Sequence, residues 1–271
     1  MAGACRVGIS GWTYAAWRGD FYPVGLRHRD ELRFAAERFT TLEVNGTFYG
    51  TQRPATFQRW HEETPHQFVF AIKGPRLVTH LKRLRDAEGP LANFLASGVL
   101  LLGGKLGPLL WQLPPTLAFD GELLDAFLHL LPGTLAEAVE LARGHDDRLA
   151  RPAIPDRVPA LPLRHALEPR HQSYADPACG EICEARGVAL VAADAAGRYP
   201  ALGRPARDLA YVRLHGEQQL YAGGYSDAAL DRWATAMRAW ADQGRDVYAY
   251  FDNDADGRAP FDALRLAGRL V

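Results

Sequence analysis

Short apolar runs of strand length recur along this chain and alternate with segments that have the residue spacing of amphipathic helices. Eight such runs lie at residues 6–9, 41–44, 68–72, 109–111, 165–168, 188–193, 209–214 and 247–251. Between them, apolar residues spaced three and four apart predict helices over residues 29–39, 86–102, 120–131, 177–186, 226–241 and 258–270. Strands that alternate with helices pair in parallel through right-handed crossovers. The alternation therefore predicts an α/β protein.

Eight strand–helix units fit the length of a closed (β/α)₈ TIM-type barrel, a fold that typically needs about 250 residues. The chain has 271 residues, of which 48% are hydrophobic, and this is enough for one large core. We therefore predict a single TIM-barrel-like domain over residues 1–271. An open, doubly wound sheet is the competing fold, but no glycine-rich dinucleotide turn follows the first strand.

Residues 134–163, which precede the fifth predicted strand, exceed what the barrel needs. Thr134 and Glu137 have the spacing of a capping box, which predicts an extra helix. The residues that follow, 146–163, are rich in arginine and proline. We expect an ordered insertion on the barrel wall; a lid over the mouth is the alternative.

Most of the predicted strands end in a polar residue. In a barrel, alternate side chains of a strand face the interior, and functional groups gather at the carboxyl ends. For the sixth strand this pattern pairs Ala192 with Asp194, and for the last it pairs Ala249 and Phe251 with Asn253. The predicted ring around one mouth consists of Glu43, Lys73, Gln112, Glu168, Asp194, Arg213, His215 and Asn253.

Further candidates lie on the loops that follow these strands. Aromatic side chains there can stack on a sugar or a base, an arginine can bind an anionic group, and a glycine-rich loop at residues 221–225 can close over a ligand. Each also has a structural explanation, such as capping the barrel core. The predicted substrate-binding residues are Trp12, Asn45, Tyr49, His80, Gln112, Arg170, His171, Tyr221 and Asn253.

The composition restricts the partners and the compartment. The net charge is −1 and the sequence pI is about 6.8, so no global basic field indicates binding to nucleic acid or to a membrane. Three cysteines do not form a disulfide framework, and Cys179 and Cys183 are expected to be buried thiols. The first strand begins within five residues of the start and no apolar run is long enough to span a membrane, so we expect a cytoplasmic protein.

The polar ring permits three functions. The first is a metal-independent hydrolase or lyase for a small polar substrate, a sugar or phosphosugar. In it, Glu43 and Glu168 are acid and base, Lys73 and Arg213 tune them, and His215 and Asp194 are further catalytic candidates. The second is a metal-dependent phosphoesterase or nuclease, although no closely spaced ligand motif occurs and no metal or other cofactor is predicted. Its available metal ligands are Glu168, Asp194, His171 and His215.

The third function is non-catalytic binding of a small ligand. A structural alternative to all three is an ion network that fills the interior, because buried charges persist in proteins when they are paired.

Seven motifs in order give the chain a family resemblance. They are GISGWTYAAWRGDFYP (8–23), LEVNGTFYG (42–50), TPHQFVFAIKGPRLVTH (64–80), GGKLGPLLWQLPP (103–115), ALEPRHQSY (166–174), YVRLHG (211–216) and VYAYFDND (247–254). With these motifs the chain resembles the YecE-like family, known as domain of unknown function 72. The resemblance implies a TIM-barrel-like fold and no established reaction. Asp252 departs from the pattern, because a second asparagine is usual there.

Overall fold

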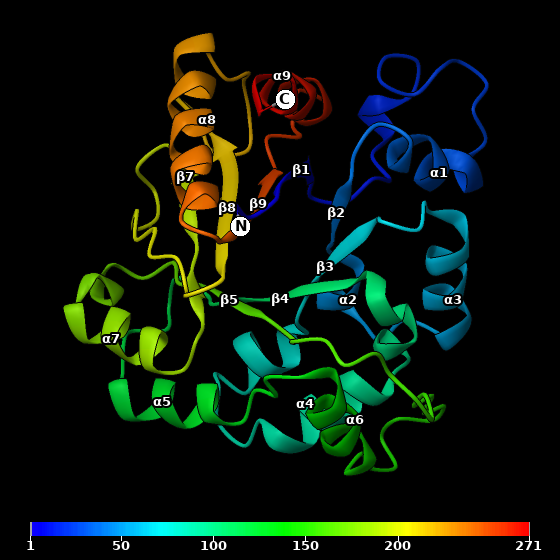
Figure 1. The fold of residues 1–271 in the computed structure, drawn as a ribbon, viewed down its shortest axis with the longest axis vertical. Coiled ribbons are helices and arrows are strands. Elements are labelled where there is room, and N and C mark those ends of the chain that lie inside the picture. The colour runs from blue at the N-terminus through cyan, green and yellow to red at the C-terminus, as the bar shows by residue number, and fades with distance from the viewer. Residues whose placement is uncertain (1, 271) are drawn as a thin grey trace. The chain divides into compact units, whose positions relative to one another are not determined.

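The computed structural model describes residues 2–270 as an α/β protein whose strands form two parallel sheets (Figure 1). The strand orders are β1-β9-β8-β7 in one sheet and β2-β3-β4-β5-β6 in the other. The strands are β1 (Cys5–Ile9), β2 (Thr41–Val44), β3 (Val69–Lys73), β4 (Leu106–Gln112), β5 (His165–Glu168), β6 (Ala189–Leu190), β7 (Ala192–Ala195), β8 (Leu209–Gly216) and β9 (Asp246–Phe251). The predicted alternation of strands and helices is confirmed.

All the predicted helices are present, and the two α-helices that follow β2, α2 and α3, were not predicted. The helices are α1 (Glu31–Ala36), α2 (Gly46–Tyr49), α3 (Pro54–Glu63), α4 (Glu88–Ala96), α5 (Gly121–His129), α6 (Leu135–Arg143), α7 (Pro177–Ala185), α8 (Asp227–Asp242) and α9 (Ala259–Leu270). Side chains cap four of them at the N-terminus: those of Asp120, Thr134, Asp176 and Ser226 each accept a hydrogen bond from a backbone N–H of the first turn. A single π-helical turn, Leu77–Leu81, follows β3.

The prediction of one closed ring of eight strands differs from the observed pairing. The sixth apolar run is interrupted at Val191, so it forms two short strands, β6 and β7, which belong to different sheets. Just beyond β1, Ser10 makes only an isolated parallel bridge, to Glu43 of β2. The structure therefore shows parallel strands in two sheets, with no continuous eight-stranded ladder among residues 2–270.

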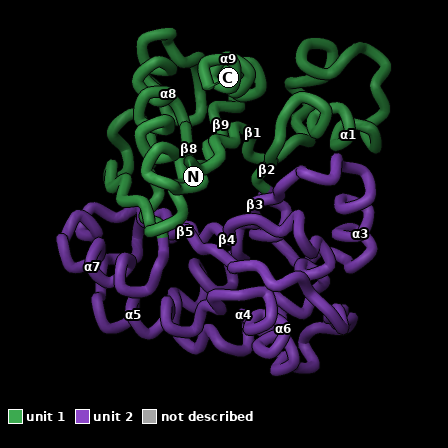
Figure 2. Tube along the Cα trace, in the orientation of Figure 1, with its two compact units in different colours: residues 1–43, 189–271 green, residues 44–188 purple. Residues whose placement is uncertain are grey.

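The chain divides into two compact units, which are described here one at a time (Figure 2). Unit 1 comprises residues 1–43 and 189–271, and unit 2 comprises residues 44–188. In unit 1 the parallel register aligns Val7, Ala249 and Val212 on one face of the sheet. The opposite face presents the row Gly8, Tyr250 and Arg213. One face of this sheet is thus apolar, and the other carries hydroxyl and charged groups.

In unit 2 the core is built on β3, β4 and β5. Trp111 of β4 is buried, and its indole N–H donates to Nδ1 of His165, 3.1 Å away. The other ring nitrogen of His165 lies 2.8 Å from the carbonyl oxygen of Pro132, to which it donates. Burial lowers the pKa of His165 to about 4, so this histidine is a neutral, fully bonded core residue.

The predicted insertion is ordered and is hydrogen-bonded to α4. Its helix α6 buries Leu135, Ala138, Val139 and Ala142. Beyond α6, Asn93 exchanges two hydrogen bonds of 2.9 Å with Asp146, one to its carboxylate and one from its backbone N–H. The backbone N–H of Ala153 donates to the carbonyl of Ala96 at 2.7 Å. These contacts describe a segment that is fixed to the wall of unit 2.

The capping box gives a first testable prediction. Thr134 Oγ1 accepts a hydrogen bond of 3.1 Å from the backbone N–H of Glu137, and Glu137 accepts one of 2.7 Å from Gly133. Replacing Thr134 with alanine should lower the free energy of unfolding by about 1 kcal/mol, because an N–H of the first turn loses its acceptor. Urea denaturation measures the change. Thr134→Ser, which keeps the acceptor, should stay near the wild-type value, and an equal loss in both variants would contradict the capping role.

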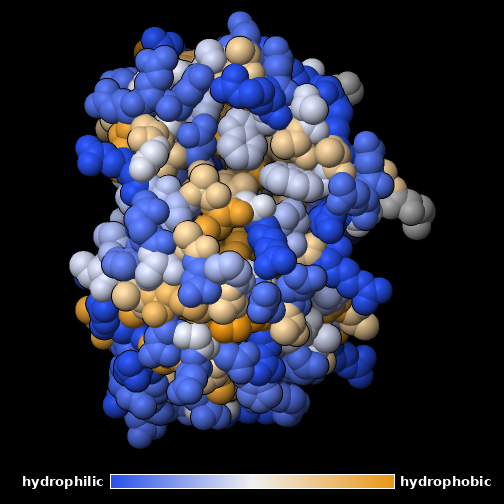
Figure 3. All heavy atoms as spheres, turned by 90° about the vertical axis from the view of Figure 1, so that its left-hand side faces the viewer, coloured by the Kyte–Doolittle hydropathy of each residue, from blue (hydrophilic) through white to orange (hydrophobic). Residues whose placement is uncertain are grey.

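Large apolar side chains are mostly buried, and Figure 3 shows a face covered largely by hydrophilic residues, with apolar atoms in small groups. The large apolar side chains that are exposed are Val24, Tyr49, Leu77, Leu81, Leu161 and Leu264. Within residues 2–270, no helix combines the length and the apolar character that crossing a bilayer requires.

Candidate functional site

A buried ion pair between Glu43 and Arg213 is the centre of a polar cluster in unit 1. Nη2 of Arg213 lies 2.7 Å from Oε1 of Glu43, and its Nε lies 3.1 Å from Oε2. Ser10 donates to Oε1 at 2.5 Å, and Tyr211 donates to Oε2 at 2.7 Å. Both charged side chains are at most 1% exposed. The Glu43 carboxylate therefore accepts four hydrogen bonds from three side chains, which fix its position.

Arg213 also contacts a second carboxylate, that of Asp252, which directly follows β9. Its Nη2 lies 3.1 Å from Oδ2 of Asp252. The same Oδ2 lies 3.0 Å from Nδ1 of His215, two residues after Arg213 on β8. The other ring nitrogen of His215, Nε2, lies 3.4 Å from Nη1 of Arg213. A carboxylate on Nδ1 places the proton there and leaves Nε2 as an acceptor, which is the orientation of a general base.

Both carboxylate oxygens of Asp254 are buried, and the Tyr14 hydroxyl is a neighbouring hydrogen-bond donor. Burial raises the pKa of Asp254 to about 8, and the negative charge of Asp252 adds to the rise. The Tyr14 hydroxyl, which donates to the Ser10 carbonyl at 2.6 Å, and Arg213 act in the opposite direction on the pKa of Asp254. At neutral pH this side chain is therefore mainly a neutral acid, close to the negative charge of Asp252.

Two tyrosine rings stand edge-on to His215. The centroids of Tyr221 and Tyr199 lie 5.4 and 6.0 Å from the imidazole centroid, and their hydroxyls are 3.3 Å apart. Tyr221 has a φ of 62°, a left-handed conformation that is strained for a tyrosine. Tyr199 lines an open pocket of about 710 Å³, formed with Ala196, Arg198, Gln218, Gln219 and Leu220. A small molecule in this pocket would lie against a ring that contacts His215.

Two residues of the predicted ring point elsewhere. Asp194 pairs in register with Leu214, so it lies on the sheet face opposite Arg213; its carboxylate lies 3.4 Å from the indole nitrogen of Trp233 on α8. Asn253 donates to the Gly223 carbonyl at 2.7 Å and to Asp262 of α9 at 2.9 Å. The predicted inward direction was wrong for both. The alternation of faces was assigned incorrectly for two reasons. The sixth run is interrupted at Val191, and in the last strand the side chains on the face of Arg213 are the set that includes Tyr250, not the set that includes Asn253.

The side chains of β9 that face the polar cluster were not identified from the sequence. Register places Tyr250 beside Gly8 and Arg213, so the parity that leads to Asp252 is the one that shares the polar face. The signal was present in the sequence, since Tyr248, Tyr250 and Asp252 alternate with apolar residues. Ser10, Tyr211, Asp252 and Asp254 are the members of the cluster that were not among the predicted site residues.

A second polar cluster, in unit 2, follows the predicted parity. Register aligns Lys73 with Leu110 and Ala166, and aligns Gln112 with Glu168 two residues later, so Lys73, Gln112 and Glu168 share one face. All three are buried. The ammonium group of Lys73 lies 4.4 Å from the centroid of the Phe48 ring, a cation–π contact. Arg170 lies 3.4 Å from Oε1 of Glu168, with its side chain only 10% exposed.

His80, on the π-helical turn, belongs to the same cluster. Its Nε2 lies 3.5 Å from Nε2 of Gln112, and its ring packs edge-on against Phe48, with centroids 5.0 Å apart. Burial lowers the pKa of His80 to about 4, and the positive charges of Lys73 and Arg170 lower it further. His80 is therefore neutral at physiological pH and offers this cluster a hydrogen bond without a charge. π-Helical turns are frequent at functional sites.

The remaining predicted substrate-binding residues lie apart from these contacts or on their margins. Trp12 is half-buried, and its carbonyl accepts from Tyr22 at 2.6 Å. Asn45 is half-buried at the start of α2, and Tyr49 is 72% exposed. His171 lies at the start of a 3₁₀ turn, and its Nδ1 accepts from the backbone N–H of Ser173 at 3.2 Å. For His171, a local capping role accounts for the observed contacts.

The residues named as possible metal ligands have other neighbours in their own units. Within residues 2–270, no three side chains of the His, Cys, Asp and Glu types are grouped so that they could hold a metal ion. Cys179 and Cys183 are buried thiols one helical turn apart on α7, as predicted, and neither forms a disulfide within residues 2–270.

Two curated bacterial proteins are similar to this chain in sequence. UPF0759 protein YecE of Escherichia coli K12 is 26% identical over 185 residues, which cover 63% of this chain and 64% of that protein. The match thus spans slightly less than two thirds of the curated relative. UPF0759 protein YunF of Bacillus subtilis is 27% identical over 117 residues, or 40% of this chain and 39% of that protein.

Solved structures share the fold. A DUF72 family protein from Thermotoga maritima matches with a TM-score of 0.75 and 24% identity, over 98% of this chain and 99% of that one. A DUF72 family protein from Enterococcus faecalis matches with the same TM-score and 17% identity, over 98% and 95% of the two chains. The family model "Protein of unknown function DUF72" matches residues 6–271. The chain therefore belongs to the DUF72 family.

Proposed function

We propose that this protein is a hydrolase or lyase that transfers protons on a small, polar, hydroxyl-rich substrate such as a sugar. The observation that carries the proposal is the His215–Asp252 pair, which lies in the same cluster as the buried carboxyl group of Asp254. A buried carboxyl group that keeps its proton, close to an imidazole oriented by a carboxylate, supplies the acid and the base that proton transfer requires. The polar clusters at the strand ends agree with the location of catalytic groups in α/β folds.

Glu43 has a different role from the one its sequence position suggests. Its four hydrogen bonds occupy the carboxylate, so protonation would cost at least one of them. The interpretation as a structural ion network therefore fits the Glu43–Arg213 pair. Glu43 then holds Arg213, and Arg213 in turn holds Asp252 and Nε2 of His215. In the proposed mechanism Glu43 is a positioning residue.

His215 serves as the base and Asp254 as the acid. The contact between His215 Nε2 and Arg213, 3.4 Å, is long, and a substrate hydroxyl can replace it. Asp254 has a pKa of about 8 and holds a proton at neutral pH, which it can deliver to a leaving oxygen. Tyr199 and Tyr221 supply ring faces and hydroxyls of the kind that hold sugars.

Charge in the unit 1 cluster favours a neutral substrate. Two carboxylates, Glu43 and Asp252, outnumber one guanidinium, that of Arg213, so these three groups carry a net negative charge even when Asp254 is protonated. A phosphorylated substrate would be repelled. In unit 2 the balance is reversed, because Lys73 and Arg170 outnumber Glu168. An anionic substrate is therefore better matched to the unit 2 cluster.

A chromogenic screen tests the proposal. A panel of p-nitrophenyl glycosides should include at least one substrate, and His215→Gln should lower its kcat by roughly 10²- to 10⁴-fold, the range usual for removing a general base or acid. Asp254→Asn should remove the high-pH limb of the kcat/KM profile. Tyr22→Phe, which alters a buried hydroxyl outside the cluster, is the control and should leave kcat unchanged.

Two results would contradict this function. One is turnover that persists unchanged in both His215→Gln and Asp254→Asn. The other is the absence of turnover across the panel together with variants whose only effect is a lower melting temperature, which would assign the whole cluster to a structural network.

A further inference from the structure

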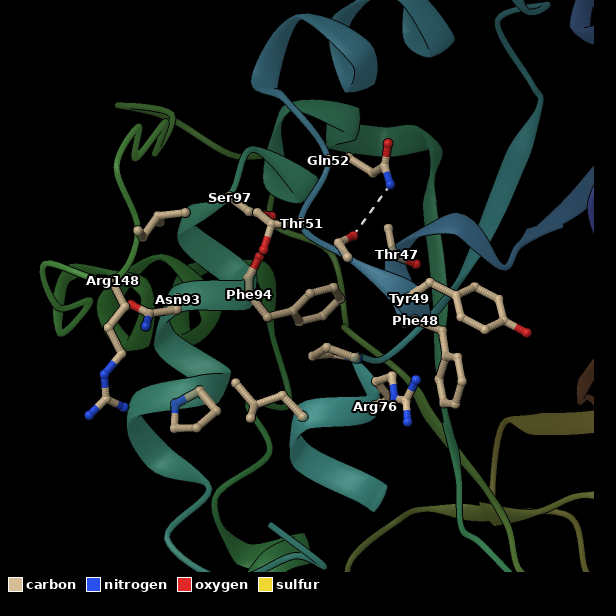
Figure 4. Close-up of a pocket in the computed structure, with 15 residues that line it drawn as sticks. Thr47, Phe48, Tyr49, Thr51, Gln52, Arg76, Asn93, Phe94, Ser97 and Arg148 are labelled. Atoms are coloured by element: carbon tan, nitrogen blue, oxygen red, sulfur yellow. Dashed lines mark hydrogen bonds between the residues drawn. The ribbon is translucent and has the colours of Figure 1, made fainter. Parts of the chain in front are cut away.

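We infer that unit 2 contains a separate binding site for a small oxyanion with a flat apolar body, between α4 and the loops that follow β2 and β3. The site is a pocket of about 180 Å³ whose lining includes side chains of the inserted segment (Figure 4). Its lining residues are Thr47, Phe48, Tyr49, Gly50, Thr51, Gln52, Pro75, Arg76, Leu77, Pro90, Asn93, Phe94, Ser97, Arg148 and Leu149. It involves none of the residues that the proposed function uses.

The apolar part of the lining sets the shape of the ligand. Phe94 and Pro90 are buried in α4, and Figure 4 shows the Phe94 ring between the side of the pocket that carries Arg148 and the side that carries Phe48. Leu77 is 40% exposed and Tyr49 is 72% exposed, which is unusual for large apolar side chains in this protein. A flat hydrocarbon or aromatic group in the pocket would cover both.

The charge of the lining sets the head group. Two arginines, Arg76 and Arg148, are among the lining residues, on opposite sides of Phe94 in Figure 4, and no carboxylate is among the lining residues. No ion pair of Arg76 is found within residues 2–270, and Arg148 has only a distant one, 4.0 Å from Asp146, with 77% of its side chain exposed. Arginine binds phosphate and carboxylate groups through paired N–H donors. A negatively charged head group is therefore favoured, and a cationic ligand is disfavoured.

Contacts outside the pocket hold the inserted segment in place next to Arg148. Asn93 uses its side-chain amide on Asp146, both as donor and as acceptor, at 2.9 Å. This exchange fixes the chain two residues before Arg148, whose guanidinium has only the distant contact of 4.0 Å with Asp146. Asn93 lies beside Arg148 in Figure 4. The insertion thus contributes one of the two cations of the site, which is a role beyond covering the wall.

The pocket and the polar cluster of unit 2 share structural elements. The Phe48 ring lines the pocket and also contacts Lys73 and His80. The segment around the π-helical turn gives Arg76 and Leu77 to the pocket and His80 to the cluster. Three non-glycine residues just after this turn have positive φ: Arg83, Leu84 and Asp86, at 51°, 69° and 44°. Such strain is common at binding sites and switch regions.

Titration calorimetry with phenyl phosphate tests this site. Phenyl phosphate has the flat body and the oxyanion; benzoate has the same body with the other oxyanion, inorganic phosphate lacks the body, and phenol lacks the charge. We expect saturable binding of phenyl phosphate or benzoate, and binding at least tenfold weaker for inorganic phosphate and phenol. Arg76→Gln and Arg148→Gln should each weaken binding of the preferred probe by roughly tenfold.

Arg151→Gln is the matched control, because Arg151 is an exposed arginine of the same segment that does not line the pocket. It should bind the probe as tightly as the wild type. The assignment is overturned if neither aryl probe binds at millimolar concentration, or if the three arginine variants bind equally. It is also overturned if inorganic phosphate binds as tightly as phenyl phosphate. None of these outcomes depends on catalytic activity, so failure here and failure of the proposed function are distinguishable.

Discussion

Replacing Glu43 with glutamine should lower the free energy of unfolding by roughly 3–5 kcal/mol, the usual cost of removing one partner of a buried ion pair. Arg213 is at most 1% exposed, and it would lose the Glu43 carboxylate while its Nη2 still lay 3.1 Å from the carboxylate of Asp252. The amide of glutamine can accept hydrogen bonds on its oxygen alone, so its nitrogen would face an N–H or O–H donor. Urea denaturation at 25 °C measures the difference.

An exposed ion pair provides the matched control. Glu140 lies 2.6 Å from Arg143, but both side chains are at least 60% exposed. Glu140→Gln should therefore change the free energy of unfolding by less than about 0.5 kcal/mol. A loss below about 1 kcal/mol for Glu43→Gln would show that water reaches the pair and that its buried geometry does not describe the protein in solution.

Asp254→Asn should make the protein more stable at pH 8 and remove part of the loss of stability that occurs as the pH rises from about 4 to about 8. The native pKa of Asp254 is about 8, and an unfolded aspartate has a pKa of about 3.9. Between these values the native state binds the proton and the unfolded state does not, so stability falls as the pH rises from about 4 to about 8. Four pKa units correspond to about 5 kcal/mol, and relaxation of the native site when Asp254 ionises reduces the expected loss to about 2–4 kcal/mol.

The melting temperature of wild type and variant, measured from pH 5 to pH 8.5, tests this expectation. The two curves should lie close together near pH 5 and diverge as the pH rises, with the variant above. Asp20→Asn, at an exposed carboxylate of the same unit, should run parallel to the wild type. Parallel curves for Asp254→Asn would show that Asp254 is already ionised in the native protein.

Periodicity predicted the elements well, because strand and helix periods depend only on nearby residues. β2 begins and ends where the apolar run does, and the signal at Ser226 and Asp227 marks the start of α8. The shared face of Lys73, Gln112 and Glu168 was also predicted correctly. A strand that runs without interruption carries its alternation of faces through to its end.

The direction of side chains at interrupted or ambiguous strand ends was not predictable in the same way. Asp252 and Asn253 are adjacent polar residues, and only the register of β9 with β8 decides which one lies beside Arg213. For Asp194, the break at Val191 changes the face that later residues present. A shift of one residue reverses every assignment of inside and outside.

The role of Glu43 also depended on distant parts of the chain. The donors that occupy its carboxylate come from Ser10, Tyr211 and Arg213, which are 33, 168 and 170 residues away in sequence. A sequence shows that a carboxylate ends a strand, but it does not show how many donors converge on it. That number separates a proton carrier from a structural anion.

The guanidinium of Arg213 contacts four other residues, and this restricts which substitutions position 213 can accept. Its Nη2 reaches Ser10, Glu43 and Asp252, while Nε and Nη1 reach Glu43 and His215. A lysine has one nitrogen at the end of a flexible stem, so it retains the charge but not this set of connections. Two segments near the beginning of the sequence and two from its last quarter are thus joined through one planar group. A redesign of the cluster must therefore change Arg213 together with its four partners, which are Ser10, Glu43, His215 and Asp252.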